Sequence, residues 1–251
     1  MAVIFWFSGT GNSLYAAKNL AEGIGGAELV RVTDDAPAGS YGGEGEKVGF
    51  VIPSYYCNLP RAVSTFIEKA DIRPGSYIFG VVTMGKLGQG TVSALAKALK
   101  AKGLRLSYGK GVKMPANYVA MYNPADKLKV AEELAETDIL LSGFAGEIAE
   151  GAEALKGFPF IGKKLYKNIP ELDKAFFYRD VCIGCYLCEK ICPVRNIQMD
   201  GDRPKWLGKC EHCMACISWC PVKAIEYGEK TRERRRYRNP KINASELSAR
   251  E

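Results

Sequence analysis

Eight of the nine cysteines in this 251-residue chain lie between Cys182 and Pro221, in two copies of one spacing. The copies read Cys182-Ile-Gly-Cys185-Tyr-Leu-Cys188-Glu-Lys-Ile-Cys192-Pro193 and Cys210-Glu-His-Cys213-Met-Ala-Cys216-Ile-Ser-Trp-Cys220-Pro221. Two-residue gaps let three thiolates of one loop reach three corners of a 4Fe-4S cube, and the fourth cysteine, before proline, serves the other cube. The spacing predicts two 4Fe-4S clusters with interleaved ligands. One set is Cys182, Cys185, Cys188 and Cys220, and the other is Cys210, Cys213, Cys216 and Cys192.

Disulfides and zinc are the other common uses of closely spaced cysteines. Disulfides need an oxidising compartment, and structural zinc usually takes two cysteine pairs rather than runs of four that end in proline. The apolar opening Ala2 to Phe7 lacks the basic region and the small-residue cleavage site of a signal peptide. No apolar run reaches the length that spans a bilayer. We therefore expect a cytoplasmic protein with no membrane partner.

The start of the chain has the pattern of a phosphate site. The apolar run Ala2 to Phe7 predicts a strand buried on both faces. It ends in Ser8-Gly9-Thr10-Gly11-Asn12-Ser13, and apolar residues then recur at helical spacing from Leu14 to Ile24. Such a turn offers an anion close backbone approach at its glycines, inward N–H groups and the positive end of a helix dipole. A purely structural turn is the alternative.

This stretch lacks the Gly-Lys-Ser/Thr ending of the nucleotide-triphosphate loop and the third glycine of the dinucleotide fingerprint. It resembles the flavodoxin phosphate loop, Ser/Thr-x-Thr-Gly-Asn-Thr/Ser, which binds the phosphate of FMN without lysine or arginine. The resemblance implies an FMN cofactor in contact with this loop. Its phosphate ligands would be Ser8, Thr10, Gly11, Asn12 and Ser13, with Gly9 between them.

Strand-like and helix-like segments alternate up to about residue 154. Strands are expected at 2–7, 28–32, 48–52, 77–84 and 104–112, and helices at 14–24, 61–70, 90–102 and 126–154, the last broken near Ser142-Gly143. This alternation predicts an α/β fold with a doubly wound, parallel, five-stranded sheet, and the resemblance of the first loop implies that this sheet is flavodoxin-like. Ligands bind such sheets at the carboxyl ends of the strands, where the strand order reverses.

Two loops at those strand ends, Pro53 to Leu59 and Thr83 to Gly90, resemble the flavin-ring loops of flavodoxins. Tyr55 or Tyr56 can supply a stacking face, and the backbone of the two turns can contact the polar edge of the ring. The residues expected at the ring are Pro53, Ser54, Tyr55, Tyr56, Asn58, Thr83, Met84, Gly85 and Gly88. Cys57 is expected to be a small apolar side chain rather than a nucleophile. The segment Met114 to Pro124 either caps the flavin, faces the cysteine module or is an ordinary loop.

The composition divides the chain into residues 1–156, a Gly-, Pro- and Lys-rich linker (157–172), a cysteine-rich domain (173–230) and a basic tail (231–251). The first of these resembles flavodoxins, and the cysteine-rich domain resembles small two-cluster ferredoxins, which implies a small α+β ferredoxin-like domain. A hairpin is expected at 194–206, between the two cysteine runs. His212, the only histidine, is expected beside the ligands or at the surface. The tail Arg232 to Pro240 is either a solvated face, a segment folded back on the cluster domain, or a docking site for an acidic redox partner.

Taken together, the loop, the two cysteine runs and the Arg-Tyr-x-Asn-Pro tail resemble the flavodoxin-ferredoxin fusion proteins of anaerobic bacteria and archaea. The resemblance implies electron transfer between two 4Fe-4S clusters and FMN in anaerobic redox metabolism, with a redox protein as partner. The alternative is an FMN-dependent reductase of a small molecule, with Tyr55, Tyr56 or Tyr118 as proton donor. A homodimer stays open.

The formal net charge of +7 is concentrated in the last hundred residues, since residues 1–150 carry about 15 basic and 15 acidic side chains. Two oxidised clusters and a flavin phosphate bring about −2 each, which leaves the loaded protein near +1. We therefore expect no nucleic-acid partner.

Overall fold

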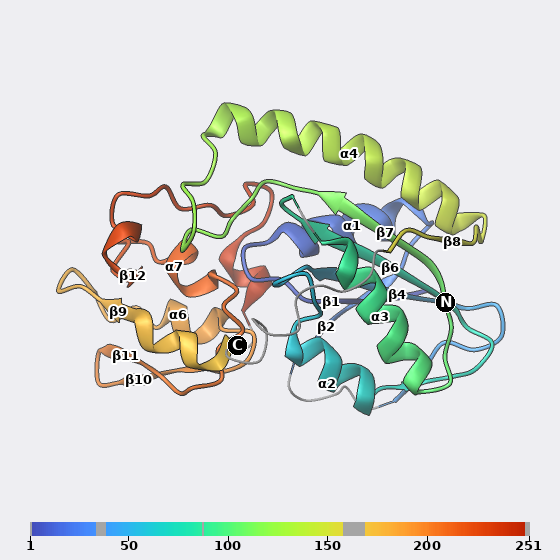
Figure 1. Ribbon diagram of the computed structural model, residues 1–251, viewed down its shortest axis with the longest axis horizontal. Coiled ribbons are helices and arrows are strands. Elements are labelled where there is room, and N and C mark those ends of the chain that lie inside the picture. Colours follow the sequence, from blue (N-terminus) through green and yellow to red (C-terminus); the bar gives the residue numbers. More distant parts are fainter. Residues whose placement is uncertain (1, 34–38, 87, 158–168, 249–251) are drawn as a thin grey trace.

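The computed structural model describes residues 2–33, 39–86, 88–157 and 169–248, and all structural statements concern these residues (Figure 1). Two parts lie side by side: a larger α/β part from the N-terminal segments, and a smaller part that carries the cysteine runs. Most of the linker predicted at 157–172 lies outside the described residues, and so does Leu87 in the predicted loop Thr83 to Gly90.

A parallel sheet forms the centre of the α/β part. Its strands are β1 (Val3–Trp6), β2 (Glu28–Arg31), β4 (Lys47–Pro53), β6 (Tyr77–Met84), β7 (Leu106–Lys113) and β8 (Ala154–Leu155), in the order β2-β1-β4-β6-β7-β8. Every neighbouring pair is parallel, which confirms the doubly wound parallel sheet. The sequence predicted five of these strands. The sixth, β8, has only two residues and is too short to show a periodic pattern.

Helices cover both faces of this sheet (Figure 1), which is why its central strands are unbroken apolar runs. On one face, α2 (Arg61–Lys69) and α3 (Gln89–Ala101) pack against a core that includes Phe5, Phe50 and Ile78. On the other, α1 (Asn12–Gly23) and α4 (Lys127–Ala149) pack against residues of the opposite pleat. The break predicted near Ser142-Gly143 was wrong: α4 is continuous, and a Cβ at Gly143 would meet nothing within 4 Å. Beside the sheet, β3 (Ser40–Tyr41) pairs with β5 (Asp71–Ile72).

The smaller part combines short strands with short helices. Strand β9 (Phe176–Tyr178) pairs antiparallel with β12 (Ile225–Tyr227), and β10 (Ile197–Asp200) forms the predicted hairpin with β11 (Arg203–Trp206). The helices α6 (Leu187–Ile191) and α7 (Ala215–Trp219) each begin inside a cysteine run. Short 3-10 turns occur at Ile169–Ala175, Glu229–Thr231 and Ala244–Leu247. No helix in the described part of the chain is both long enough and apolar enough to cross a membrane.

The two parts share their hydrophobic cores, and the basic tail packs over both. Trp6 of β1 belongs to one buried cluster with Trp219 of α7 and with Tyr237, Ile242 and Leu247 of the tail. A solvated face, one of the three expectations for the tail, is therefore wrong. The tail folds back because apolar residues interrupt its charges, and its contacts extend to the α/β part as well as the cysteine part.

Candidate functional site

A cavity of about 260 Å³ lies at the carboxyl ends of the sheet strands. The strand order reverses there, because β2 joins one side of β1 and β4 joins the other. Twelve of the fifteen residues that the sequence predicted for a cofactor line this pocket, and Gly11, Asn58 and Gly88 do not. The twelve are Ser8, Gly9, Thr10, Asn12, Ser13, Pro53, Ser54, Tyr55, Tyr56, Thr83, Met84 and Gly85.

The loop between β1 and α1 forms one side of the pocket. The hydroxyl groups of Ser8, Thr10 and Ser13 are buried there. The Gly11 N–H donates to Ser8 Oγ over 3.1 Å, and Ser13 Oγ lies 2.8 Å from Thr83 Oγ1 at the carboxyl end of β6. Gly11 has φ 99° and precedes α1 without a side-chain cap, so the first N–H groups of the helix are open to an anion.

The side-chain amide of Asn12 forms hydrogen bonds with other parts of the protein. Its Nδ2 donates to the carbonyl oxygen of Pro115 over 3.0 Å. Its Oδ1 accepts from Tyr237 Oη at 2.6 Å and from Asn239 Nδ2 at 3.2 Å. The side-chain amide is thus committed to protein partners, and the backbone N–H remains for a ligand.

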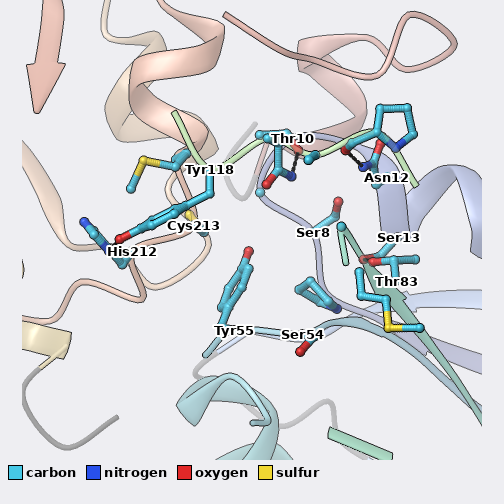
Figure 2. A pocket seen from close by; sticks show the side chains of 18 of the residues that line it. Ser8, Thr10, Asn12, Ser13, Ser54, Tyr55, Thr83, Tyr118, His212 and Cys213 are labelled. Carbon is cyan, nitrogen blue, oxygen red and sulfur yellow. Dashed lines mark hydrogen bonds between the residues drawn. The ribbon is translucent and has the colours of Figure 1, made fainter. Parts of the chain in front are cut away.

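Aromatic residues form the opposite side (Figure 2). Tyr56 Oη lies 2.6 Å from Tyr118 Oη and 2.7 Å from His212 Nδ1, and Tyr118 Oη lies 2.9 Å from the same nitrogen. His212 is 2% exposed, and this burial lowers its pKa to about 4, so a neutral imidazole shares hydrogen bonds with these hydroxyls through Nδ1. The expectation of a surface histidine is wrong, and His212 instead lies beside the ligands. Tyr56 and Cys57 both have positive φ, which fixes this turn in an uncommon conformation.

The second cysteine run forms part of the pocket wall through His212, Cys213 and Met214. A Cβ at Gly9 would lie 2.5 Å from the Cys213 carbonyl oxygen, so only glycine permits this approach. None of these three residues was predicted at the pocket. The contacts of the second cysteine run join segments far apart in the chain, so no local pattern could indicate them. Lys86, in the predicted loop Thr83 to Gly90, also lines the pocket. So does Asn117, whose Nδ2 donates to Thr10 Oγ1 over 2.6 Å, in the segment Met114 to Pro124 for which capping the flavin was one of three expectations.

The eight clustered cysteines meet in two groups of four. One cavity, here the outer cavity, is lined by Cys182, Cys185, Cys188 and Cys220 together with Ile183, Met199 and Ile225. The inner cavity is lined by Cys192, Cys210, Cys213 and Cys216 together with Phe176, Val194 and Trp206. Each group has the composition expected from the spacing. None of the nine cysteines, all of which are described, is in a disulfide.

The chemistry of the two groups suits iron-bound thiolates. Burial raises the pKa of the Cys188 and Cys210 thiols to about 12, so a coordinating metal is needed to hold them deprotonated at neutral pH. Backbone N–H groups donate to sulfur over 3.2 Å in both cavities, to Cys192 from Asn196 and to Cys220 from Ala224. Such bonds stabilise anionic sulfur, and the apolar lining keeps water away.

Residues 181–225 match the family model of the 4Fe-4S dicluster domain. This part of the chain is a 4Fe-4S dicluster domain. It is similar to a ferredoxin of Pyrobaculum islandicum, with 30% identity over 60 residues. That match covers 23% of this chain and 56% of the ferredoxin, so the chain spans little more than half of that relative's length.

Solved structures similar to the α/β part include the two-electron reduced flavodoxin of Megasphaera elsdenii, with 18% identity and a TM-score of 0.35. The match covers 44% of this chain and 85% of the flavodoxin. A flavodoxin from the domain Archaea shows 15% identity and a TM-score of 0.33, over 59% of this chain and 97% of that chain.

Proposed function

We propose that this protein transfers electrons between two 4Fe-4S clusters and an FMN molecule in the pocket. The position of Cys213 carries the proposal, because this residue lines both the inner cavity and the pocket. FMN, when bound, supplies a centre that takes up electrons singly or in pairs. The chain itself binds and orients the three groups and excludes water between them.

Four cysteines hold each cluster in this proposal. Cys182, Cys185, Cys188 and Cys220 bind the outer cluster, and Cys192, Cys210, Cys213 and Cys216 bind the inner one. The grouping of the side chains around two cavities supports this assignment. Hydrogen bonds to sulfur and the apolar lining are the means by which the chain influences the potential of each cluster.

The pocket suits FMN at both of its ends. Buried hydroxyl groups and the uncapped start of α1 form the end that fits a phosphate, and the loop Ser8 to Ser13 contains no basic residue. Tyr55, Tyr56 and Tyr118 line the other end and offer faces and edges to a flat ring. Cys213 lines the same pocket as these aromatic residues and the loop Ser8 to Ser13 (Figure 2).

The two cysteine groups differ in exposure, and this difference gives the order of the redox centres. Cys185 of the outer group is exposed, and Ile183 beside it is 64% exposed, whereas Cys192, Cys210 and Cys216 of the inner group are buried. Electrons therefore pass between a redox partner protein and the outer cluster, then the inner cluster, then the flavin, in either direction. The domain boundaries, the cytoplasmic location and a homodimer stay predictions.

A small-molecule reductase is the second candidate, and it requires a proton donor at the flavin. Tyr118 lines the pocket, but burial raises its pKa far above the ordinary value, and its hydrogen bond with Tyr56 raises it further. A hydroxyl with a raised pKa is a weak acid at neutral pH. This environment favours the electron carrier over the reductase.

Cofactor content tests the proposal directly. The protein is purified without oxygen, its iron, sulfide and FMN are counted, and it is titrated with dithionite while absorbance is followed. We expect about eight irons and one FMN per chain, with cluster and flavin bands bleaching together. Zinc in place of iron, or a protein that binds no FMN, would contradict the proposal.

A further inference from the structure

The Arg-Tyr-x-Asn-Pro tail motif lies directly behind the phosphate loop. We propose that Tyr237 and Asn239 are positioning residues, which hold this loop in the form that accepts the FMN phosphate. The tail thereby makes retention of FMN depend on the docked state of the C-terminal segment. This inference rests on the proposed function, in which the loop binds FMN.

Three hydrogen bonds join the motif to the loop. The Asn239 N–H donates to the carbonyl oxygen of Thr10 over 2.8 Å. Tyr237 Oη and Asn239 Nδ2 both donate to Asn12 Oδ1, at 2.6 and 3.2 Å. The carbonyl oxygen of Gly9, one residue before Thr10, accepts from Trp219 Nε1 over 3.1 Å. Two successive carbonyl groups of the loop are thus held by C-terminal residues.

A hydrogen bond that fixes a carbonyl group also fixes the direction of the N–H group of the following residue. The peptide unit is planar, and its C=O and N–H point in opposite directions. The bond to the Gly9 carbonyl therefore sets the direction of the Thr10 N–H group, and the bond to the Thr10 carbonyl sets that of the Gly11 N–H group, which donates to Ser8 Oγ within the loop. A loop without lysine or arginine binds an anion through such oriented N–H groups and hydroxyls, so their direction determines its affinity for phosphate.

The tail also packs closely against the loop Ser8 to Ser13. A Cβ at Gly11 would lie 3.0 Å from Asn239 Cβ and 3.1 Å from Ile242 Cβ, at a residue whose φ of 99° already favours glycine. Tyr237 is 4% exposed and Asn239 is fully buried. Water therefore has little access to replace the hydrogen bonds if a side chain is removed.

Ion pairs and hydrogen bonds fix the tail on both parts of the molecule. Arg236 Nη2 lies 2.5 Å from Glu226 Oε2 in the cluster domain, and both side chains are buried. Farther on, the Leu247 carbonyl oxygen accepts from Arg31 Nη1 at 2.5 Å, and Glu246 pairs with Lys18 of α1. The motif thus links the cluster domain to the phosphate loop, and loss of docking at either end would release the loop.

The test compares FMN with riboflavin, which lacks the phosphate. Dissociation constants for both are measured with the iron-loaded, flavin-free wild-type chain, Tyr237→Phe and Asn239→Ala. The matched control is Asn243→Ala, because Asn243 lies in the same segment and caps the turn Ala244–Leu247 without an observed bond to the loop. We expect the preference of the wild type for FMN over riboflavin to fall about tenfold in each variant, the effect of losing one buried hydrogen bond, and to persist in the control.

A second measurement separates positioning from misfolding. Iron content is determined for each protein, and hydrogen exchange of amides 9–13 is followed in the flavin-free state. Full iron with faster exchange in these amides supports the proposal. An unchanged ratio of the two dissociation constants, or equal weakening of FMN and riboflavin, would overturn it while leaving the proposed function intact. A wild-type protein that binds no FMN would overturn both.

Discussion

Gly9, in the loop between β1 and α1, lies against Cys213 of the second cysteine run, so closely that a Cβ at residue 9 would stand 2.5 Å from the Cys213 carbonyl oxygen and 2.9 Å from its Cβ. This contact joins the pocket to the inner cavity. Under the proposed function it brings the inner cluster, rather than the outer one, next to the flavin.

Gly9→Ala tests the close approach. A methyl group that meets backbone atoms at this distance forces the loop and the cysteine run apart, and overpacking of this kind costs about 1–3 kcal/mol of unfolding free energy. We expect slower reduction of bound FMN by the reduced clusters in stopped-flow absorbance. Gly143→Ala is the control, since nothing lies within 4 Å of its added Cβ. Unchanged flavin reduction in Gly9→Ala would show that the contact is not on the electron path.

Cys213→Ser tests the assignment of ligands to two clusters. Loss of one thiolate should remove the inner cluster and leave about four of the eight irons, with the outer cluster still reducible. Cys185→Ser should lose the other four irons. Cys57→Ser should lose no iron, because Cys57 lies outside both cysteine groups. Iron analysis and electron paramagnetic resonance of the reduced proteins distinguish the three variants. Loss of iron from Cys57→Ser would contradict the grouping.

Removal of iron should destabilise the cluster domain far more than the sheet. Without metal, four thiols face each other around each cavity, and the short elements from β9 to β12 lose the two centres around which they are arranged. An anaerobic chelator should therefore accelerate hydrogen exchange in residues 176–227, while the central strands β4 and β6 stay protected. Equal protection before and after chelation would indicate a domain that folds without its clusters.

Glu211→Ala should loosen the docking of the two parts. The buried Glu211 carboxylate accepts from the N–H groups of Arg61 and Ala62 at the start of α2, over 3.1 and 3.0 Å. Its removal leaves those donors unpaired, at a cost of about 1–3 kcal/mol in unfolding free energy. Glu153→Ala is the control, because its exposed pair with Arg105 contributes at most about 1 kcal/mol. Denaturant titrations of both variants measure the difference, and equal midpoints would argue against a docking role.

Short-range patterns account for what was predicted correctly. The spacing within Cys182 to Pro221 groups the cysteines because cluster ligands come from tight loops. The apolar runs separated by helical periods determine the parallel sheet because each strand must be buried on both faces. The position of the loop Ser8 to Ser13 follows from the same order of strand, turn and helix. A two-residue strand such as β8 carries no such pattern and was missed.

The amino-acid sequence by itself determined the two cysteine groups, the doubly wound sheet and the polar loop at its first turn, since each follows from short patterns that repeat along the chain. Only the tertiary structure decided that the Cys192 group lies beside the pocket, that His212 is buried against Tyr56, and that Asn239 supports Thr10. These pairs are separated by more than 150 residues. Their contacts arise from the packing of two cores against each other, and no local periodicity encodes that arrangement.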